Sequence, residues 1–394
     1  MIKAASGYTT EVDDVALACS QLKMQISEKL QLMKHSVGIV QCDQEFLDAG
    51  IINVLNKELG IPLVGGSTVA SATNESVGSF QFSILVLTSD DVEFAVSHTN
   101  GLRKDCFGAV EKSFKDSLAK QYAQNDKPLK LALIFSPAVK EIAGDSYVEA
   151  IEQVCGKVPV FGTLFVNDAL PDFDCGSSLC NDEFFINEMS YVLLFGNVSP
   201  RFFVATVPKQ SNLTEARAVI TRASGNIAYE INNMPAIKYY ESIGLAANGS
   251  LNKGAGFVPL LITLPNAADK IPFVRALLRA EPDGSVMFSG KMFEGAEFSC
   301  GSNFGTDVLS STYDLVSRMS HEQGAAALFF SCLIRQLVIG SNPTRELAHV
   351  KDVLNADIPF MASYGAGEVS PTSIDCNNNA QNRFHNYTFI VCLL

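Results

Sequence analysis

Residues 131–135 read LALIF, and after a segment of helix length residues 158–163 read VPVFGT. The same order occurs twice more, with VGIV at 37–40 before IPLVGGST at 61–68, and AALFF at 326–330 before IPFMASYG at 358–365. A short apolar strand, a crossover helix and a second strand form a βαβ unit with parallel strands. The sequence therefore predicts a βαβ unit that is repeated three times.

Each copy ends in a further apolar run that starts with a hydroxyl residue, at 83–87, 190–194 and 388–392. In the first two copies a polar turn leads to another strand, at 92–96 and 201–207, which we expect to return as a hairpin. The fold class that follows is mixed α+β, with extended mixed sheets built from βαβ-plus-hairpin units.

A chain of 394 residues is long for one core, so we expect two domains. The first covers 12–207 and holds copies one and two, after a helix-patterned segment at 12–34. The segment 208–225 is polar with mixed periodicity and serves as the boundary. The second domain covers 226–394, with a predicted helix at 235–245, a hairpin across Pro282-Asp283-Gly284, a helix near 307–319 and copy three.

The formal net charge of −13, with no basic run, argues against nucleic acids and anionic membrane surfaces as partners. Apolar runs such as 324–334 stop well short of the roughly 20 residues of a membrane helix. The first ten residues lack the basic-then-apolar pattern of a signal peptide, so we expect a cytoplasmic protein.

Seven of the ten cysteines lie in apolar patterns, where thiols act as small hydrophobic groups: Cys19, Cys42, Cys106, Cys155, Cys300, Cys332 and Cys392. Cys175 and Cys180 are the only close pair, and their spacing does not match the usual zinc ligands. They are either structural or a redox pair.

Small and hydroxyl residues follow the proline-containing strands of the first two copies: Gly66, Ser67 and Thr68, then Gly162 and Thr163. Their backbone N–H groups and hydroxyls suit a polar or anionic ligand at the strand ends, although the glycines also suit tight turns alone. No Walker motif or Gly-x-Gly-x-x-Gly helix start is present, which argues against nucleotides.

Copy three departs from the other two, and we expect the functional site there. It has Ala362 where they have a glycine, and it adds Tyr364 and Gly367 next to Glu368. Arg335 and Glu368 each lie just beyond a strand, so the fold brings them to one sheet edge. Arg335 suits a ligand carboxylate. Glu368 either accepts from an amine or pairs with Arg335.

Of the five histidines, at 35, 98, 321, 349 and 385, His385 is the best metal or haem ligand, because it precedes the last strand beside Asn386. His98 and His321 are weaker axial candidates. No Cys-x-x-Cys-His motif is present, which excludes covalent haem.

An enzyme is the remaining alternative. Cys332 with Arg335, Glu368 and His385 would make a thiol-dependent hydrolase. Against it, Cys332 ends a wholly apolar strand, where a buried thiol is usually inert, and no Gly-x-Ser-x-Gly elbow is present.

Several short motifs occur in order along the second half of the chain. They are Pro235-Ala236 before Tyr239-Tyr240, FVRALL at 273–278, GKMFEG at 290–295, CLIR at 332–335, YGAGEVSP at 364–371 and FHNYTF at 384–389. Their order resembles that of the FIST (F-box and intracellular signal transduction) domain. Residues 12 to about 207 resemble the N-terminal half of this domain, and residues 235–394 resemble the C-terminal half.

The resemblance implies a cytoplasmic sensor that binds a small ligand and signals through a separate partner such as a histidine kinase. A subgroup implies haem b and nitric oxide sensing instead. The oligomeric state stays open, a homodimer included. The expected ligand-binding set is Arg335, Glu368, His385, Asn386, Tyr364, Gly367, Cys332, Gly66, Ser67, Thr68, Gly162 and Thr163, with His385 as metal ligand only if haem is bound.

Overall fold

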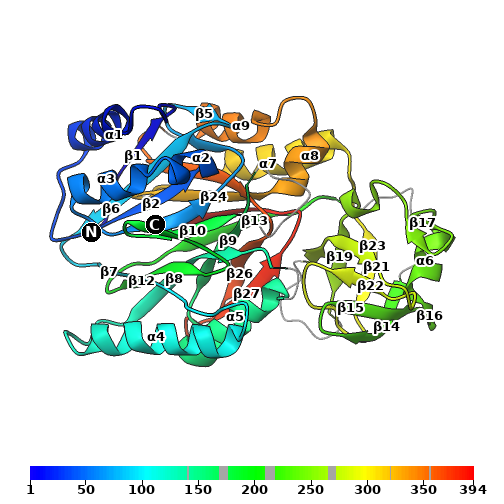
Figure 1. Cartoon of the computed structure of the whole chain (residues 1–394). Coiled ribbons are helices and arrows are strands. Elements are labelled where there is room, and N and C mark those ends of the chain that lie inside the picture. Colours follow the sequence, from blue (N-terminus) through cyan, green and yellow to red (C-terminus); the bar gives the residue numbers. More distant parts are fainter. Residues whose placement is uncertain (140–141, 168–175, 209–217, 265–271, 320, 355) are drawn as a thin grey trace.

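The structure, a computed structural model, describes residues 1–394 except 140–141, 168–175, 209–217, 265–271, 320 and 355. It has two parts (Figure 1). The larger part, here called the body, comprises three six-stranded sheets and the helices that cover them. The smaller part, here called the lobe, is a mainly β structure made by residues 218–300.

The three sheets of the body have the same plan, read from the same edge in each. The first sheet runs β1 (Lys3–Thr9), β6 (Phe82–Ser89), β2 (His35–Cys42), β3 (Leu63–Ser67), β10 (Ser177–Cys180), β11 (Glu183–Ile186). The second runs β7 (Glu93–His98), β12 (Ser190–Phe195), β8 (Leu129–Pro137), β9 (Val160–Phe165), β26 (Glu368–Ile374), β27 (Ala380–His385). The third runs β13 (Arg201–Ala205), β28 (Phe389–Leu393), β24 (Ala327–Cys332), β25 (Phe360–Gly365), β4 (Ser71–Thr73), β5 (Val77–Gly78).

The centre of each sheet is the parallel pair that the sequence predicts: β2 with β3, β8 with β9, and β24 with β25. The last two strands of each sheet come from elsewhere in the chain. The hairpin β10–β11 follows β9 but completes the first sheet, β26–β27 follows β25 but completes the second, and β4–β5 follows β3 but completes the third. Each sheet is therefore complete only with a hairpin from another third of the chain.

The predicted return strands are present but do not form hairpins with the strands before them. β7 pairs with β12, and β13 pairs with β28. The prediction of a local hairpin is wrong here because β6 already has β1 and β2 on its two edges. The turn after β6 therefore delivers the chain to the second sheet, where β12 has a free edge.

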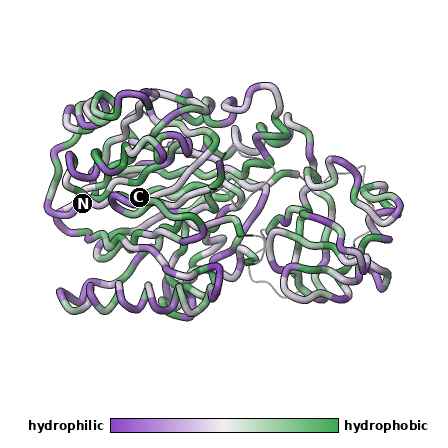
Figure 2. The backbone as a smooth tube through the Cα atoms, in the orientation of Figure 1, coloured by the Kyte–Doolittle hydropathy of each residue, from purple (hydrophilic) through white to green (hydrophobic). Residues whose placement is uncertain are grey.

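The inner faces of the three sheets meet in one apolar core, with Leu133, Phe161 and Leu328 among its members. Helices cover the outer faces, as the mostly hydrophobic interior strands and more polar helices of Figure 2 illustrate. The first sheet carries α1 (Val15–Lys29), α2 (Gln44–Asp48) and α3 (Ile51–Leu59), the second carries α4 (Cys106–Tyr122) and α5 (Gly144–Cys155), and the third carries α7 (Gly305–Met319) and α9 (Arg345–Val353). The short α8 (Leu333–Ile339) directly follows β24. Among the helices in the described part of the chain, none combines the length and apolar character that a membrane crossing requires.

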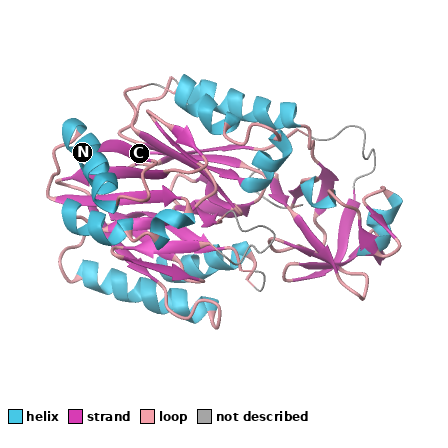
Figure 3. Ribbon diagram, turned by 45° about the horizontal axis from the view of Figure 1, so that its top comes forward, coloured by secondary structure: helices cyan, strands magenta, loops and turns pink. Residues whose placement is uncertain are grey.

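The lobe has its own apolar core and lies to one side of the body (Figures 1 and 3). Its sheet runs β20 (Phe273–Arg275), β19 (Leu260–Thr263), β23 (Glu297–Cys300), β14 (Ala218–Ser224), β15 (Ile227–Ile231), β22 (Val286–Phe288), β21 (Leu277–Ala280), with β16 (Met234–Pro235) beside β15. The remaining elements are α6 (Ala236–Ser242), a short 3₁₀ helix (Ala255–Phe257), and the pair β17 (Ala246–Ala247) and β18 (Ser250–Leu251).

The chain leaves the body after β13 and enters the lobe at β14, which lies within the predicted boundary segment 208–225. From α7 onward, however, residues of the predicted second domain rejoin the body, and β26 and β27 lie in the same sheet as β8 and β9. The lobe is therefore an insertion into the body. Of the predicted cysteine pair, Cys180 is buried in β10 and Cys175 lies outside the described residues.

Gly65 and Gly162 occupy matching places in β3 and β9, where each strand crosses close to its parallel neighbour. A Cβ added to Gly162 would lie 2.0 Å from the carbonyl oxygen of Ile134, and one added to Gly65 would lie 1.9 Å from that of Val40. Both glycines have positive φ, 157° and 159°. The glycines that the repeat pattern singles out are thus required by backbone packing.

We expect Gly162→Ala to lower the free energy of unfolding by more than about 2 kcal/mol, because the backbone of β8 must move to admit the methyl group. Urea denaturation of the purified variant measures this directly.

The matched control is Gly60→Ala, at a left-handed helix end where an added Cβ meets nothing within 4 Å. It is expected to cost only about 1 kcal/mol, from backbone conformation alone. Equal losses in the two variants would show that the close approach at Gly162 is not what requires glycine.

Candidate ligand site between the body and the lobe

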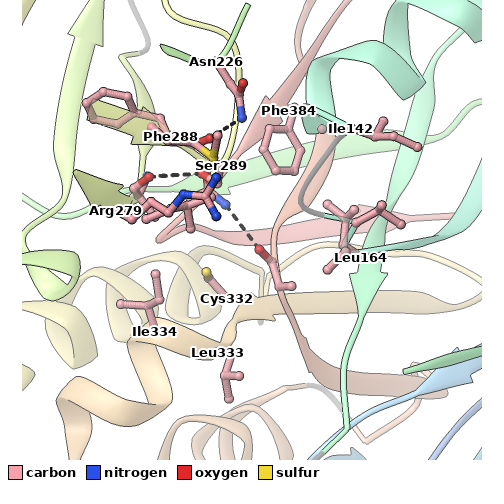
Figure 4. Close-up of a pocket in the computed structure, with 18 residues that line it drawn as sticks. Ile142, Leu164, Asn226, Arg279, Phe288, Ser289, Cys332, Leu333, Ile334 and Phe384 are labelled. Atoms are coloured by element: carbon pink, nitrogen blue, oxygen red, sulfur yellow. Dashed lines mark hydrogen bonds between the residues drawn. The ribbon is translucent and has the colours of Figure 1, made fainter. Parts of the chain in front are cut away.

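A cavity of about 270 Å³ lies where the lobe meets the body (Figure 4). The body contributes Ile142, Leu164 and Phe384, together with Cys332, Leu333 and Ile334 at the junction of β24 and α8. The lobe contributes Asn226 and residues of β21 and β22, among them Arg279 and Phe288. Its volume is near the lower end of the range for small-molecule sites, and its wall is mainly apolar with a few polar groups, as in most such sites.

Arg275 in β20 is the main contact that holds the lobe against the body. Its side chain is 1% exposed, and its Nη2 donates to Asp145 Oδ1 at 2.6 Å, in the first turn of α5. Its Nη1 donates to the carbonyl oxygen of Phe384 at 2.8 Å. The guanidinium also lies over the rings of Phe273 and Phe384, with 4.6 and 5.6 Å from Cζ to the ring centroids.

Further hydrogen bonds lie along the same boundary between the lobe and the body. The backbone N–H of Asn386 donates to the carbonyl of Val274 at 3.1 Å, so the end of β27 and the edge of the lobe sheet are directly bonded. The Ser289 hydroxyl donates to Asn386 Oδ1, and Asn386 Nδ2 donates to the carbonyl of Ala366 at 3.3 Å. Asn386 therefore connects the lobe to the loop between β25 and β26 along the cavity wall.

Two of the residues predicted from the sequence line the cavity: Cys332 and Asn386. The Cys332 side chain is almost completely buried, and burial next to the Glu368 carboxyl raises the pKa of its thiol well above the usual value. Cys332 is therefore a neutral thiol at physiological pH. Because the thiolate is the nucleophilic form, this environment does not favour the hydrolase alternative.

Arg335 is not in the cavity wall, and its partner differs from the one considered from the sequence. It is fully buried and pairs with Glu346 in α9, with Nη2 to Oε1 at 2.8 Å, rather than with Glu368. Its Nη2 also contacts Thr312 Oγ1 in α7 at 2.7 Å, and its Nη1 donates to the carbonyl of Tyr387. These contacts occupy the guanidinium, which joins α8 to α7 and α9.

Glu368 and His385 lie behind the cavity wall. They are directly opposite each other on β26 and β27, and Glu368 is also opposite Thr163 on β9. Directly opposed residues share a face, so all three face the inside of the body, whereas Phe384, one residue before His385, faces the cavity. Glu368 Oε2 accepts from Thr388 Oγ1 at 2.7 Å.

Both groups are fully buried, and burial shifts the pKa of each toward its neutral form. Burial, with a smaller contribution from the charges of Arg275 and Arg383, lowers the pKa of His385 to about 3. Burial raises the pKa of Glu368 well above its usual value. Neither ring nitrogen of His385 nor Oε1 of Glu368 has a hydrogen-bond partner among the described residues.

The other predicted residues are structural in their placement. Gly367 has no room for a side chain, because a Cβ there would lie 2.6 Å from the Phe384 ring, so this glycine admits the ring that forms the cavity wall. Thr68 Oγ1 donates to the carbonyl of Tyr364 at 2.8 Å. Ser67 Oγ accepts from the backbone N–H of Ser177 at 2.9 Å. The Thr68 contact joins the first sheet to the third, and the Ser67 contact joins β3 to β10 within the first sheet.

The remaining three, Gly66, Gly162 and Thr163, also lie in strands of the body and not in the cavity wall. Thr163 Oγ1 donates to the carbonyl of Gly367 at 3.2 Å. The predicted strand-end site is therefore divided. Cys332 and Asn386, from the third copy, line the cavity, whereas the predicted residues of the first two copies lie inside the body.

The haem hypothesis does not fit this geometry. None of the five histidines, all of which are in the described part of the chain, lines the cavity. His385 faces away from it, and His98 stacks on Phe185 with its Nδ1 2.7 Å from the carbonyl of Thr99. Among the described residues no group of three or more His, Cys, Asp or Glu side chains is placed to hold a metal ion.

The lobe's contribution to the site was not among the predictions from the sequence. Arg275 and Leu278 are inside the FVRALL motif, which supported the resemblance to the FIST domain but was given no role in the site. Asn226, Arg279 and Ser289 carried no recognisable signal, because they are brought to the body only by the way in which the lobe packs.

Comparison with known protein families assigns the chain. The FIST N domain matches residues 36–234 and the FIST C domain matches residues 236–371. The chain belongs to the FIST family. Domains of this family are generally sensory domains that bind small ligands in signal transduction.

A search of curated proteins found no match. Among solved structures, the chain is similar to the crystal structure of cyanuric acid hydrolase from A. caulinodans, with 11% identity and a TM-score of 0.35. The alignment covers 100% of this chain and 99% of that one. A TM-score this low supports no conclusion about this protein.

We expect Arg275→Met to lower the free energy of unfolding by about 3 kcal/mol, because it leaves the mostly buried Asp145 carboxylate without its partner. Urea denaturation measures the loss, and limited proteolysis should show faster cleavage in the lobe.

Lys291→Met is the control at the same boundary. The Lys291 ammonium pairs with Glu149, but both side chains are partly exposed, so the expected loss is below about 1 kcal/mol. Similar losses in both variants would contradict the role assigned to Arg275.

The buried His385 predicts a loss of stability in acid. Between pH 6.5 and about 3 the unfolded chain binds a proton at this position and the folded chain does not, so the free energy of unfolding falls as pH falls through this window. The slope from one such group is at most about 1.4 kcal/mol per pH unit. His385→Gln should flatten this slope in denaturation curves measured from pH 7 to pH 4.

Glu368→Gln is the matched variant with the opposite sign. The folded protein keeps a proton on Glu368 that the unfolded chain releases above about pH 4.5, so this group lowers stability as pH rises. The substitution should reduce the decline in the free energy of unfolding above pH 4.5, and it should leave unchanged the pH dependence that His385 causes. Unchanged slopes in both variants would contradict the assigned protonation states.

Proposed function

We propose that this protein is a cytoplasmic sensor that binds a small ligand in the cavity between body and lobe and signals through a partner protein such as a histidine kinase. The observation that carries the proposal is that the cavity wall is shared between two parts with separate cores. A ligand that contacts both parts stabilises their closed arrangement, so binding shifts the equilibrium between arrangements of the lobe.

The residues behind the cavity support a route for the signal. Cys332, Leu333 and Ile334 line the cavity, and the next residue, Arg335, contacts Glu346 in α9 and Thr312 in α7. A displacement of the start of α8 would therefore act on two helices that form the outer surface of the third sheet. We propose this surface, α7 and α9, as the face that the partner reads.

Binding rather than catalysis is proposed because the thiol in the cavity wall, Cys332, is held in its neutral form. A cytoplasmic location is supported by the unpaired thiols. All nine cysteines in the described part of the chain are free, as is usual in a reducing compartment.

The proposal is tested by a thermal-shift screen of the full chain against small metabolites, with Ala366→Phe as the cavity variant. A ligand that binds only the folded protein raises Tm, by an amount that grows with its concentration above Kd. Ala366 lines the cavity, so a phenyl ring there should abolish the shift produced by any ligand of this site.

The control is Ala247→Phe, at an exposed position of β17 in the lobe, which should keep the full shift. A ligand whose Tm shift survives in Ala366→Phe binds elsewhere and would contradict the assignment of this cavity.

A further inference from the structure

Arg279 is the one charged side chain that lines the cavity in the part of the chain described here. It lies at a β-bulge: Leu277 is opposite Phe288 and Arg279 is opposite Met287, so Leu278 is an extra residue in β21. A bulge changes the direction of the side chains beside it. As a result, both Leu278 and Arg279 reach the cavity.

The guanidinium of Arg279 is only partly engaged. Its Nε donates to Glu281 Oε1 at 2.7 Å, and no contact of its two Nη groups is found among the described residues. Two other cations at the boundary, Arg275 and Lys291, are occupied by Asp145 and Glu149, and neither lines the cavity. Arg279 can therefore present two N–H groups in the fork geometry that matches a carboxylate.

The rest of the wall restricts the ligand further. Much of the surface is apolar, with Ile142, Leu164, Leu333 and Phe384, and no Asp or Glu in the described part of the chain lines the cavity. A ligand ammonium would thus find no counter-charge among the described lining residues, and burying an unpaired charge is costly. The protein's net charge of −13 also opposes ligands with several negative charges.

We propose that the cavity binds a small hydrophobic monocarboxylate. Its carboxylate accepts hydrogen bonds from Arg279, and its apolar part packs against Ile142, Leu164 and Phe384. This inference rests on the proposed function, since it names the ligand class of the same cavity. The cavity volume of about 270 Å³ limits the apolar part of the ligand to roughly one ring or one branched chain.

The test compares three probes of nearly equal shape by isothermal titration calorimetry on the full chain: phenylacetate, phenylacetamide and L-phenylglycine. Phenylacetate should bind about tenfold more tightly than phenylacetamide, the gain expected of a charge-assisted hydrogen bond at a partly exposed arginine. L-Phenylglycine, which is phenylacetate with an added α-ammonium group, should bind more weakly than phenylacetate, because no described residue of the cavity wall carries a counter-charge for the ammonium. Equal affinity for the acid and the amide, or tighter binding of the amino acid, overturns the inference.

Two variants assign the preference to Arg279. Arg279→Met keeps most of the apolar side chain and should lower phenylacetate affinity to that of phenylacetamide, with the amide unchanged. Glu281→Gln removes the carboxylate that competes for the guanidinium and should tighten phenylacetate binding. If Arg279→Met keeps the preference for the acid, the assignment is wrong.

The variant Ala366→Phe distinguishes the proposed ligand class from the proposed function, which is that this cavity binds a ligand at all. If phenylacetamide binds the native protein and not Ala366→Phe, the cavity is a ligand site even where no preference for the acid is found. If phenylacetate and phenylacetamide both bind Ala366→Phe as they bind the native protein, both the ligand class and the site assignment fail.

Discussion

The exchange of hairpins among the three sheets is the constraint on which the rest of the body depends. β10–β11, β26–β27 and β4–β5 each leave the third of the chain that contains them and complete the sheet of another third. The hairpin β4–β5 from the first third completes the third sheet, β10–β11 from the second third completes the first sheet, and β26–β27 from the last third completes the second sheet. Each third therefore gives one hairpin and receives one. No sheet can reach its full width alone, so the shared core of Leu133, Phe161 and Leu328 can form only when all three are present.

Buried polar contacts join neighbouring sheets inside this closed arrangement. Ser71 and Ser83 are hydrogen-bonded between the third and first sheets at 2.8 Å, Ser190 donates to the carbonyl of Gly65 between the second and first at 2.9 Å, and Thr388 donates to Glu368 beside the third and second at 2.7 Å. Buried polar groups are costly unless paired, so each contact favours one alignment of its two sheets over a slipped one. The third contact differs because it uses a carboxyl group, and it is the one that lies behind the ligand cavity.

The local parts of this fold could be predicted from the sequence, and the long-range parts could not. The parallel strand pairs and the helix near 307–319 follow from apolar runs, spacing and proline, and they are present. Which edge a strand pairs with depends on which edges are already occupied, and this made the predicted return hairpins wrong. The same holds at the site. Cys332 was singled out as the end of an apolar strand and Asn386 as the neighbour of His385, but the choice of Glu346 over Glu368 by Arg335 depends on where α9 packs.

The chain leaves the body and returns to it at neighbouring points: the backbone N–H of Ser302, on the return, donates to the carbonyl of Pro208, where the chain leaves, at 2.8 Å. The gap that a deletion of the intervening residues would leave in the body is therefore short enough for a simple turn. The body could therefore acquire or lose an inserted lobe without any change to its own three sheets. The half of the cavity wall that the lobe supplies can thus diversify in evolution independently of the half that the body supplies.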